Sequence, residues 1–165
     1  MNVAPFDPLR ILKLLHRHGV RFVIIGGIAG RLWGSTTVTN DLDICYARDR
    51  ANLESLARAL RELKAKLRGT DRDLPFQADA RTLELGGHFT FVTSAGNFDC
   101  IGTPAGTTGY DQLARTATSM DLGDLSAPVA AIEELILMKR ASARPKDLVE
   151  VQILAAVRDE IERKR

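Results

Sequence analysis

The acidic residues that offer the most chemistry form an Asp-x-Asp motif in a stretch that is otherwise typical of a buried strand. Asp41 and Asp43 flank Leu42 and are followed by Ile44. Because alternate residues of a strand share a face, we expect both carboxylates to point the same way, with Leu42 and Ile44 facing the core. Two carboxylates that are buried together repel, so one takes up a proton unless a cation neutralises them. Mg²⁺ prefers such oxygen ligands and is often shared with substrate phosphates, so the motif predicts a magnesium site.

A third candidate carboxylate lies in the segment "NFDCIG", where Asp99 stands between Phe98 and Cys100. The apolar neighbours predict a strand. If this strand pairs near the one that carries Asp41 and Asp43, three carboxylates converge. Three carboxylates can hold two divalent ions about 3.5–4 Å apart, an arrangement that promotes in-line displacement at phosphorus.

Two glycines and two hydroxyl residues precede the acidic strand. Gly26 and Gly27 follow a β-branched run and precede a helical pattern, where a backbone without side chains can approach a phosphate at a helix N-terminus. Ser35 and Thr37 are candidates for triphosphate contact. Each feature has a simpler alternative: the glycines alone can form a tight turn, the hydroxyls can bond to backbone, and an isolated Asp-x-Asp can be a surface pair. The prediction depends on their combination, and the segment does not match a P-loop.

The remaining pattern places these residues in a single small domain, residues 1–165. Helical patterns cover 8–18, 28–34, 50–67, 110–117, 130–140 and 145–163, and strand patterns cover 21–27, 35–47, much of 82–102 and part of 118–130. The turn at 94–97 indicates a hairpin. Residues 69–81 are polar and give no clear pattern. This order predicts an α/β (α+β) fold, with a mixed β-sheet packed against helices and a helical C-terminus.

Composition limits the classes of protein to consider. Of the 165 residues, 45% are hydrophobic and 27% are charged, which suits a globular chain, and the net charge of +2 permits a nucleic-acid partner without arguing for one. No apolar run reaches the roughly 20 residues of a membrane span, and no signal peptide begins the chain, so we expect a cytoplasmic protein without a membrane partner. The two cysteines and three histidines form no zinc or histidine-hydrolase motif.

Three segments together resemble the nucleotidyltransferase superfamily related to DNA polymerase β, and in particular the AbiEii/MenT-type toxins of bacterial toxin–antitoxin systems. The resemblance covers roughly residues 20–155. It is carried by "GGIAGRLWGSTTVTNDLDI", "FTFVTSAGNFDCI" and "PVAAIEELILMKRASARPKDLVEVQIL". The matching positions are Gly26, Gly27, Ala29, Arg31, Thr39, Asp41, Asp43, Asp99, Lys139, Arg144, Lys146 and Asp147.

The resemblance implies a nucleotidyltransferase fold, an NTP co-substrate and Mg²⁺, with Mn²⁺ as an alternative metal. Asp41 and Asp43 would be metal ligands, Asp99 would bind the catalytic metal and help to deprotonate the attacking hydroxyl, and Lys139 would neutralise phosphate charge. The implied acceptor is the 3′ end of a tRNA, so that translation stops, and the implied partner is a cognate antitoxin protein. Alternatives are transfer to a protein or a small molecule, and an inactive nucleotide- or RNA-binding module. Without the resemblance, Lys139 can simply complement a helix C-terminus.

The helix predicted over 50–67 is rich in arginine and lysine. These residues can form a solvated face that is held by intrahelical pairs such as Glu54–Arg58 and Glu62–Lys66. Alternatively, they can contact the phosphate backbone of an RNA, which would make binding dependent on salt.

Overall fold

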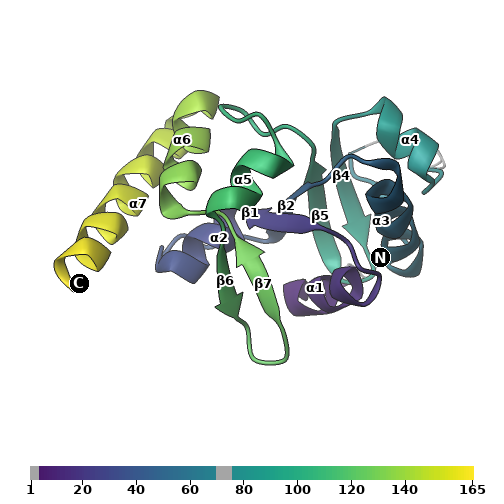
Figure 1. Ribbon diagram of the computed structural model, residues 1–165, viewed down its shortest axis with the longest axis horizontal. Coiled ribbons are helices and arrows are strands. Elements are labelled where there is room, and N and C mark those ends of the chain that lie inside the picture. Colours follow the sequence, from purple (N-terminus) through teal and green to yellow (C-terminus); the bar gives the residue numbers. More distant parts are fainter. Residues whose placement is uncertain (1–3, 70–75) are drawn as a thin grey trace.

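The computed structural model describes residues 4–69 and 76–165, which form a mixed sheet flanked by helices (Figure 1). The helices are α1 (Pro8–Arg17), α2 (Gly26–Trp33), α3 (Arg50–Glu62), α4 (Ala80–Leu85), α5 (Tyr110–Thr116), α6 (Ile132–Ser142) and α7 (Pro145–Arg163). The strands are β1 (Phe22–Ile25), β2 (Asp41–Tyr46), β3 (Lys66–Leu67), β4 (His88–Thr93), β5 (Gly96–Ile101), β6 (Thr118–Asp121) and β7 (Ser126–Val129).

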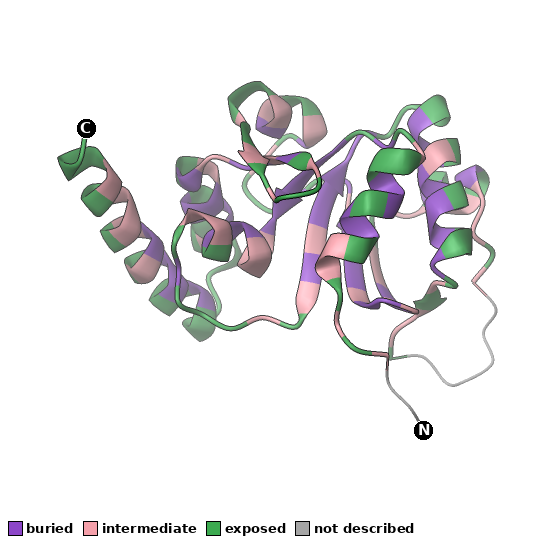
Figure 2. Cartoon of the chain, turned by 90° about the horizontal axis from the view of Figure 1, so that it is seen from below, coloured by how far each residue is buried: buried purple, intermediate pink, exposed green. Residues whose placement is uncertain are grey.

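The strand order in the sheet is β3-β4-β5-β2-β1-β7-β6. The β2–β5 and β1–β7 pairs are parallel, and the other neighbouring strands are antiparallel. The predicted mixed sheet is therefore confirmed. Its central strands are buried along most of their length (Figure 2), and the buried apolar side chains form one cluster with those of the helices.

Local sequence signals explain several of the element boundaries. Asp7 accepts a hydrogen bond from the backbone N–H of Arg10 and so caps α1, with Pro8 at the first helical position. Asp49 caps α3 in the same way by accepting from Asn52 N–H. The four residues of β1 are all buried, which fits the uninterrupted β-branched and aromatic run at the centre of the sheet.

The structure corrects the prediction for residues 50–67. The predicted helix ends at Glu62, and Lys66–Leu67 form the short edge strand β3. Lys64 has a φ of 54°, which lies in the left-handed region and breaks the helix. Arg68 continues the pairing, because its N–H donates to the carbonyl oxygen of Thr90. The charged residues after Glu62 keep the spacing typical of a helix, although the backbone is no longer helical there. This spacing explains why the predicted helix was too long.

Other boundaries also differ from the sequence prediction. The strand predicted from residue 35 begins only at Asp41. Residues 82–85, predicted as strand, belong instead to the short helix α4, with Asp79 as its cap. The predicted hairpin is confirmed as β4 and β5, and the segment at 118–130 is a second hairpin of β6 and β7. Of the polar segment 69–81, residues 70–75 lie outside the described residues.

The C-terminal helices pack as a pair at one end of the molecule, far from α3 and α4 (Figure 1). Ala143 lies in the left-handed region with a φ of 54° and separates α6 from α7. Val151 and Leu154 of α7 are buried, whereas its last turns carry no buried residue (Figure 2). No helix in residues 4–69 and 76–165 combines the length and apolar character needed to cross a bilayer.

Candidate active site

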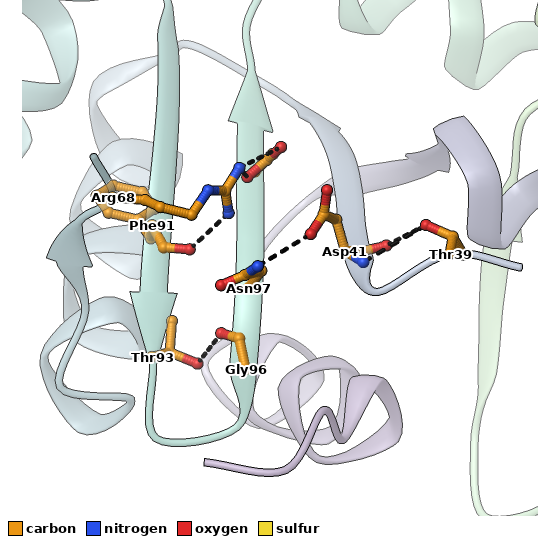
Figure 3. Close-up of polar contacts among 8 residues, drawn as sticks. Thr39, Asp41, Arg68, Phe91, Thr93, Gly96 and Asn97 are labelled. Carbon is orange, nitrogen blue, oxygen red and sulfur yellow. Dashed lines mark hydrogen bonds and ion pairs between the residues drawn. The ribbon is translucent and has the colours of Figure 1, made fainter. Parts of the chain in front are cut away.

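The acidic residues of β2 and β5 lie side by side in the middle of the sheet. Asp43 and Asp99 occupy paired positions of the two parallel strands, and Asp41 is paired with Asn97. The side-chain amide of Asn97 donates to Asp41 at 3.1 Å (Figure 3). The carboxylates that the sequence predicts to converge are thus neighbours on one face of the sheet.

The strand alternation also holds as predicted. Asp41 and Asp43 are half-buried, whereas Leu42 and Ile44 on the opposite face have no exposed area. The opposite face of β2 is therefore buried in the core. This packing fixes the register of β2 and makes both carboxylates point to the same side.

Gly26 makes room for the Asp43 carboxylate. It has a φ of +70°, and a Cβ built on it would lie 2.0 Å from Oδ2 of Asp43. Gly27 is equally constrained, because its Cβ would lie 2.8 Å from Cβ of Thr39. The space that a side chain on Gly26 or Gly27 would fill is thus occupied by Asp43 and Thr39.

The backbone of these glycines nevertheless offers an anion site. Gly26 and Gly27 are the first two residues of α2, and Ile25 at the N-cap has no side-chain group that could cap the helix. The N–H groups of a first helical turn lack intrahelical acceptors and carry the positive end of the helix dipole. An anion beside Asp43 would therefore meet backbone donors, which fits the predicted phosphate-binding role.

The charges in the cluster are coupled. Burial raises the pKa of Asp43 to about 7, and the charges of Asp99 and Asp41 and the hydrogen bond with Asp99 add to this rise, while Lys139 opposes it. Burial raises the pKa of Asp99 above its usual range as well; Arg68 and the bond with Asp43 reduce this rise without cancelling it. The same bond thus raises the pKa of Asp43 and lowers that of Asp99, which favours the proton on Asp43 and the negative charge on Asp99.

Arg68 is a residue of the site that the sequence pattern did not single out. Its Nη2 lies 2.8 Å from Oδ1 and 3.1 Å from Oδ2 of Asp99, and its Nη1 donates to the carbonyl oxygen of Phe91 at 3.1 Å (Figure 3). We expected it to end the charged helix, either as part of a solvated face or in contact with RNA. The signal that could have located it is Gly69, because a glycine often marks a turn at the end of a strand. A basic residue just before such a turn can lie beside the sheet.

Lys139 lies near the end of α6 and is held there by a buried acid. Its Nζ lies 3.4 Å from Oδ1 of Asp147, whose side chain is 1% exposed and also accepts from Nε of Arg144 at 2.8 Å. Burial works to raise the pKa of Asp147, but Arg144 and Lys139 outweigh it and hold the pKa below its usual range. Because the charge of Lys139 also lowers the pKa of Asp43, the lysine is close enough to act on the acidic cluster.

Ser35 and Thr37 have a different partner from the predicted triphosphate. Both hydroxyls donate to the carboxylate of Glu150 on α7, at 2.9 Å from Ser35 and 2.6 Å from Thr37. Ser35 is only 5% exposed and Glu150 9%. These bonds join the segment before β2 to the C-terminal helix, so the two hydroxyls support the acidic strand from outside the cluster.

The donor set fits a divalent ion in part. Asp41 and Asp43 are hard oxygen donors on one face, with an anion site beside them, as a magnesium ion shared with a phosphate requires. Across the described parts of the chain, however, no three His, Cys, Asp or Glu side chains are already arranged to hold a metal ion. Asp99, the third predicted ligand, faces Arg68 instead.

Two surface hollows, of about 180 and 410 Å³, border the second half of α7, and Trp33 contributes to both. Neither is lined by an acid of β2 or β5. The acidic cluster therefore lies on another part of the surface.

The fold is that of the nucleotidyltransferases, with an α/β arrangement of mixed sheet and C-terminal helices. The chain is similar to the lincosamide antibiotic adenylyltransferase LnuA bound to lincomycin, with a TM-score of 0.60 and 13% identity over 91% of this chain and 95% of that one. It is similar to the antibiotic-resistance factor ANT(2'')-Ia, with a TM-score of 0.57 and 13% identity over 95% and 90% of the two chains. A third similar structure, TM1012 from Thermotoga maritima, is a candidate nucleotidyltransferase, with a TM-score of 0.51 and 14% identity over 96% of each chain.

No protein-family model matches the chain, and no curated protein matches it in sequence. At such low identities the likeness to solved structures defines the fold.

We expect Gly26→Ala to destabilise the protein more than Gly19→Ala. Both glycines have a φ of +70°, but a Cβ at Gly19 meets nothing within 4 Å. The two substitutions share a backbone cost of about 1–2 kcal/mol, and Gly26→Ala adds roughly 1–3 kcal/mol by displacing Asp43. Urea unfolding of both variants measures this difference, and equal losses would show that the close approach to Asp43 is not required.

We expect Asp43→Asn to stabilise the metal-free protein at pH 8. The pKa of Asp43 rises from 3.8 to about 7 on folding, so the folded state binds the extra proton between these values and stability falls as pH rises through that window. Asparagine removes the ionisation, with an expected gain of about 1–3 kcal/mol at pH 8 and little change at pH 5, after allowance for partial exposure.

Urea unfolding with EDTA at pH 5, 6.5 and 8 tests this expectation. Asp111→Asn, at an exposed position of α5, is the matched control and should show no such pH-dependent gain. A variant Asp43→Asn that is less stable than the wild type at pH 8 would contradict the assigned electrostatics.

Proposed function

We propose that the chain is a nucleotidyltransferase that transfers an NMP group from an NTP to a hydroxyl of a small-molecule acceptor, with Mg²⁺ or Mn²⁺ as the metal. The observation that carries the proposal is the register of β2 and β5, which sets Asp43 beside Asp99, next to the uncapped first turn of α2. The likeness in fold to nucleotidyltransferases supports it. A cytoplasmic location, where NTPs and Mg²⁺ are available, belongs to the proposal.

Each residue has a role that follows from its position. Asp41 and Asp43 would hold the divalent ion, which when bound supplies positive charge to the polyphosphate. The N–H groups of Gly26 and Gly27 bind phosphate oxygens at the start of α2. Lys139, oriented by Asp147, adds a positive charge on the side of α6.

The reaction forms one P–O bond and breaks another. The acceptor hydroxyl oxygen attacks the α-phosphorus, the bond from that phosphorus to the bridging oxygen breaks, and pyrophosphate leaves. Asp99 takes the hydroxyl proton. Asp99 is suited to this role because Arg68 and Asp43 both favour its ionised form.

The choice of a small-molecule acceptor has two supports. The names of two similar structures describe an antibiotic adenylyltransferase and an antibiotic-resistance factor. In addition, the arginines of α3, which could have bound the phosphates of an RNA, form hydrogen bonds and ion pairs with residues of this chain. Arg50 pairs with Glu54 and Glu84, Arg58 donates to Ser55, and Arg61 donates to the carbonyl oxygen of Ala78. Transfer to the 3′ end of a tRNA by a toxin that an antitoxin neutralises remains the alternative suggested by the sequence motifs.

We expect the purified protein to transfer label from one of four α-³²P-labelled NTPs, in the presence of Mg²⁺, to a small molecule. The acceptor panel comprises a lincosamide, an aminoglycoside, a small-molecule extract, total tRNA and lysate proteins. Asp41→Asn should reduce transfer roughly 10³-fold or more, equivalent to about 4 kcal/mol of transition-state stabilisation, whereas Asp111→Asn should not.

If the label appears on tRNA instead of a small molecule, the toxin alternative replaces the proposal. Growth arrest on expression would then be measured with and without the neighbouring gene. Equal transfer by Asp41→Asn and the wild type would contradict the assignment of the site.

A further inference from the structure

The pair formed by Arg68 and Asp99 occupies the place where the sequence motifs imply a metal ligand. Arg68 reaches both carboxylate oxygens of Asp99, at 2.8 and 3.1 Å. The side chain of Asp99 is 13% exposed and that of Arg68 31%. The pair is thus largely shielded from solvent, unlike a surface ion pair.

The guanidinium is fixed independently of Asp99. Its Nη1 donates to the carbonyl oxygen of Phe91 on β4 (Figure 3), and the backbone N–H of Arg68 donates to Thr90 on the same strand. The arginine is therefore aligned by the sheet itself. A side chain that is held at its backbone and at its tip loses little further freedom when it binds the carboxylate.

We propose that Arg68 takes the place of a second divalent ion at Asp99, so that the site holds one divalent ion, on Asp41 and Asp43. This inference rests on the proposed function. One nitrogen of the guanidinium, Nη2, lies within hydrogen-bond distance of both oxygens of Asp99, so it competes with a metal ion for these oxygens. A divalent cation at Asp99 would also meet the fixed charge of Arg68, and their repulsion is twice that between unit charges.

The charges of the cluster support a single ion. Asp41, Asp43 and Asp99 carry three negative charges when they are ionised, and Arg68 and one divalent ion carry three positive charges. A second divalent ion would leave an excess of positive charge before the NTP binds. Arg68 is thus a positioning residue, which holds the Asp99 carboxylate where a second ion would otherwise bind it.

The number of bound Mn²⁺ ions tests the inference. Titration calorimetry and Mn²⁺ EPR are performed with a saturating non-hydrolysable NTP analogue on the wild type, Arg68→Ala, Arg68→Lys and Arg48→Ala. Arg48 is the matched control, because its guanidinium also donates to backbone carbonyls, those of Gly86 and Glu84, and has no carboxylate partner within residues 4–69 and 76–165.

We expect one ion per protein for the wild type, Arg68→Lys and Arg48→Ala, and two for Arg68→Ala. Two ions in the wild type, or one ion in Arg68→Ala, would overturn the inference and leave the proposed function intact. No Mn²⁺ binding by the wild type would overturn both.

Asp99→Asn provides a measurement that does not depend on the folding of Arg68→Ala. Because Asp99 binds Arg68 rather than metal, Asp99→Asn should still bind one Mn²⁺ ion, with an affinity within about threefold of the wild type. A loss of the ion, or an affinity at least tenfold weaker, would show that Asp99 is a metal ligand and would overturn the inference.

Discussion

The repulsion among three carboxylates on one face of the sheet is the constraint on which the rest of the site depends. Asp43 and Asp99 are held in register by parallel strands whose opposite face is fully buried, so neither can move away without disturbing the core. The protein compensates by a shared proton, by Arg68 beside Asp99 and by Lys139 at the end of α6. Each compensating group lies on a different element. The local charge balance therefore links the edge strand β3, the central sheet and the C-terminal helices.

Much of the fold and of the acidic cluster could be predicted from sequence, because the responsible signals are local. The period of two in β2 fixes which residues face the core, and Asp7 and Asp49 mark helix starts through their own hydrogen bonds. Asp99 could be placed near Asp43 only through the additional assumption that β5 pairs with β2, which the family resemblance supports.

The residues that sequence reasoning missed act through long-range contacts. Arg68 meets Asp99 across 31 positions of the chain, and Glu150 meets Thr37 across 113. Charged residues within a helical pattern most often form a solvated face, so the pattern around Arg68 predicted helix, and only the tertiary pairing of β3 with β4 shows otherwise. The sequence also did not reveal that Gly26 makes room for a carboxylate of its own chain, that of Asp43.

The same contacts explain why the site is rigid on one side of the acidic cluster and adjustable on the other. Asp99 is held by the guanidinium of Arg68, which β4 fixes in turn, and under the proposed function this arrangement suits a base that must keep one orientation throughout the reaction. Asp43 is instead half-buried with a pKa of about 7, so its charge changes when a cation approaches. A cation that binds there displaces a proton rather than a side chain, and it does so without disturbing the buried face of β2. Under the proposed function, metal binding and base orientation therefore belong to neighbouring carboxylates with opposite surroundings, although both lie at paired positions of β2 and β5.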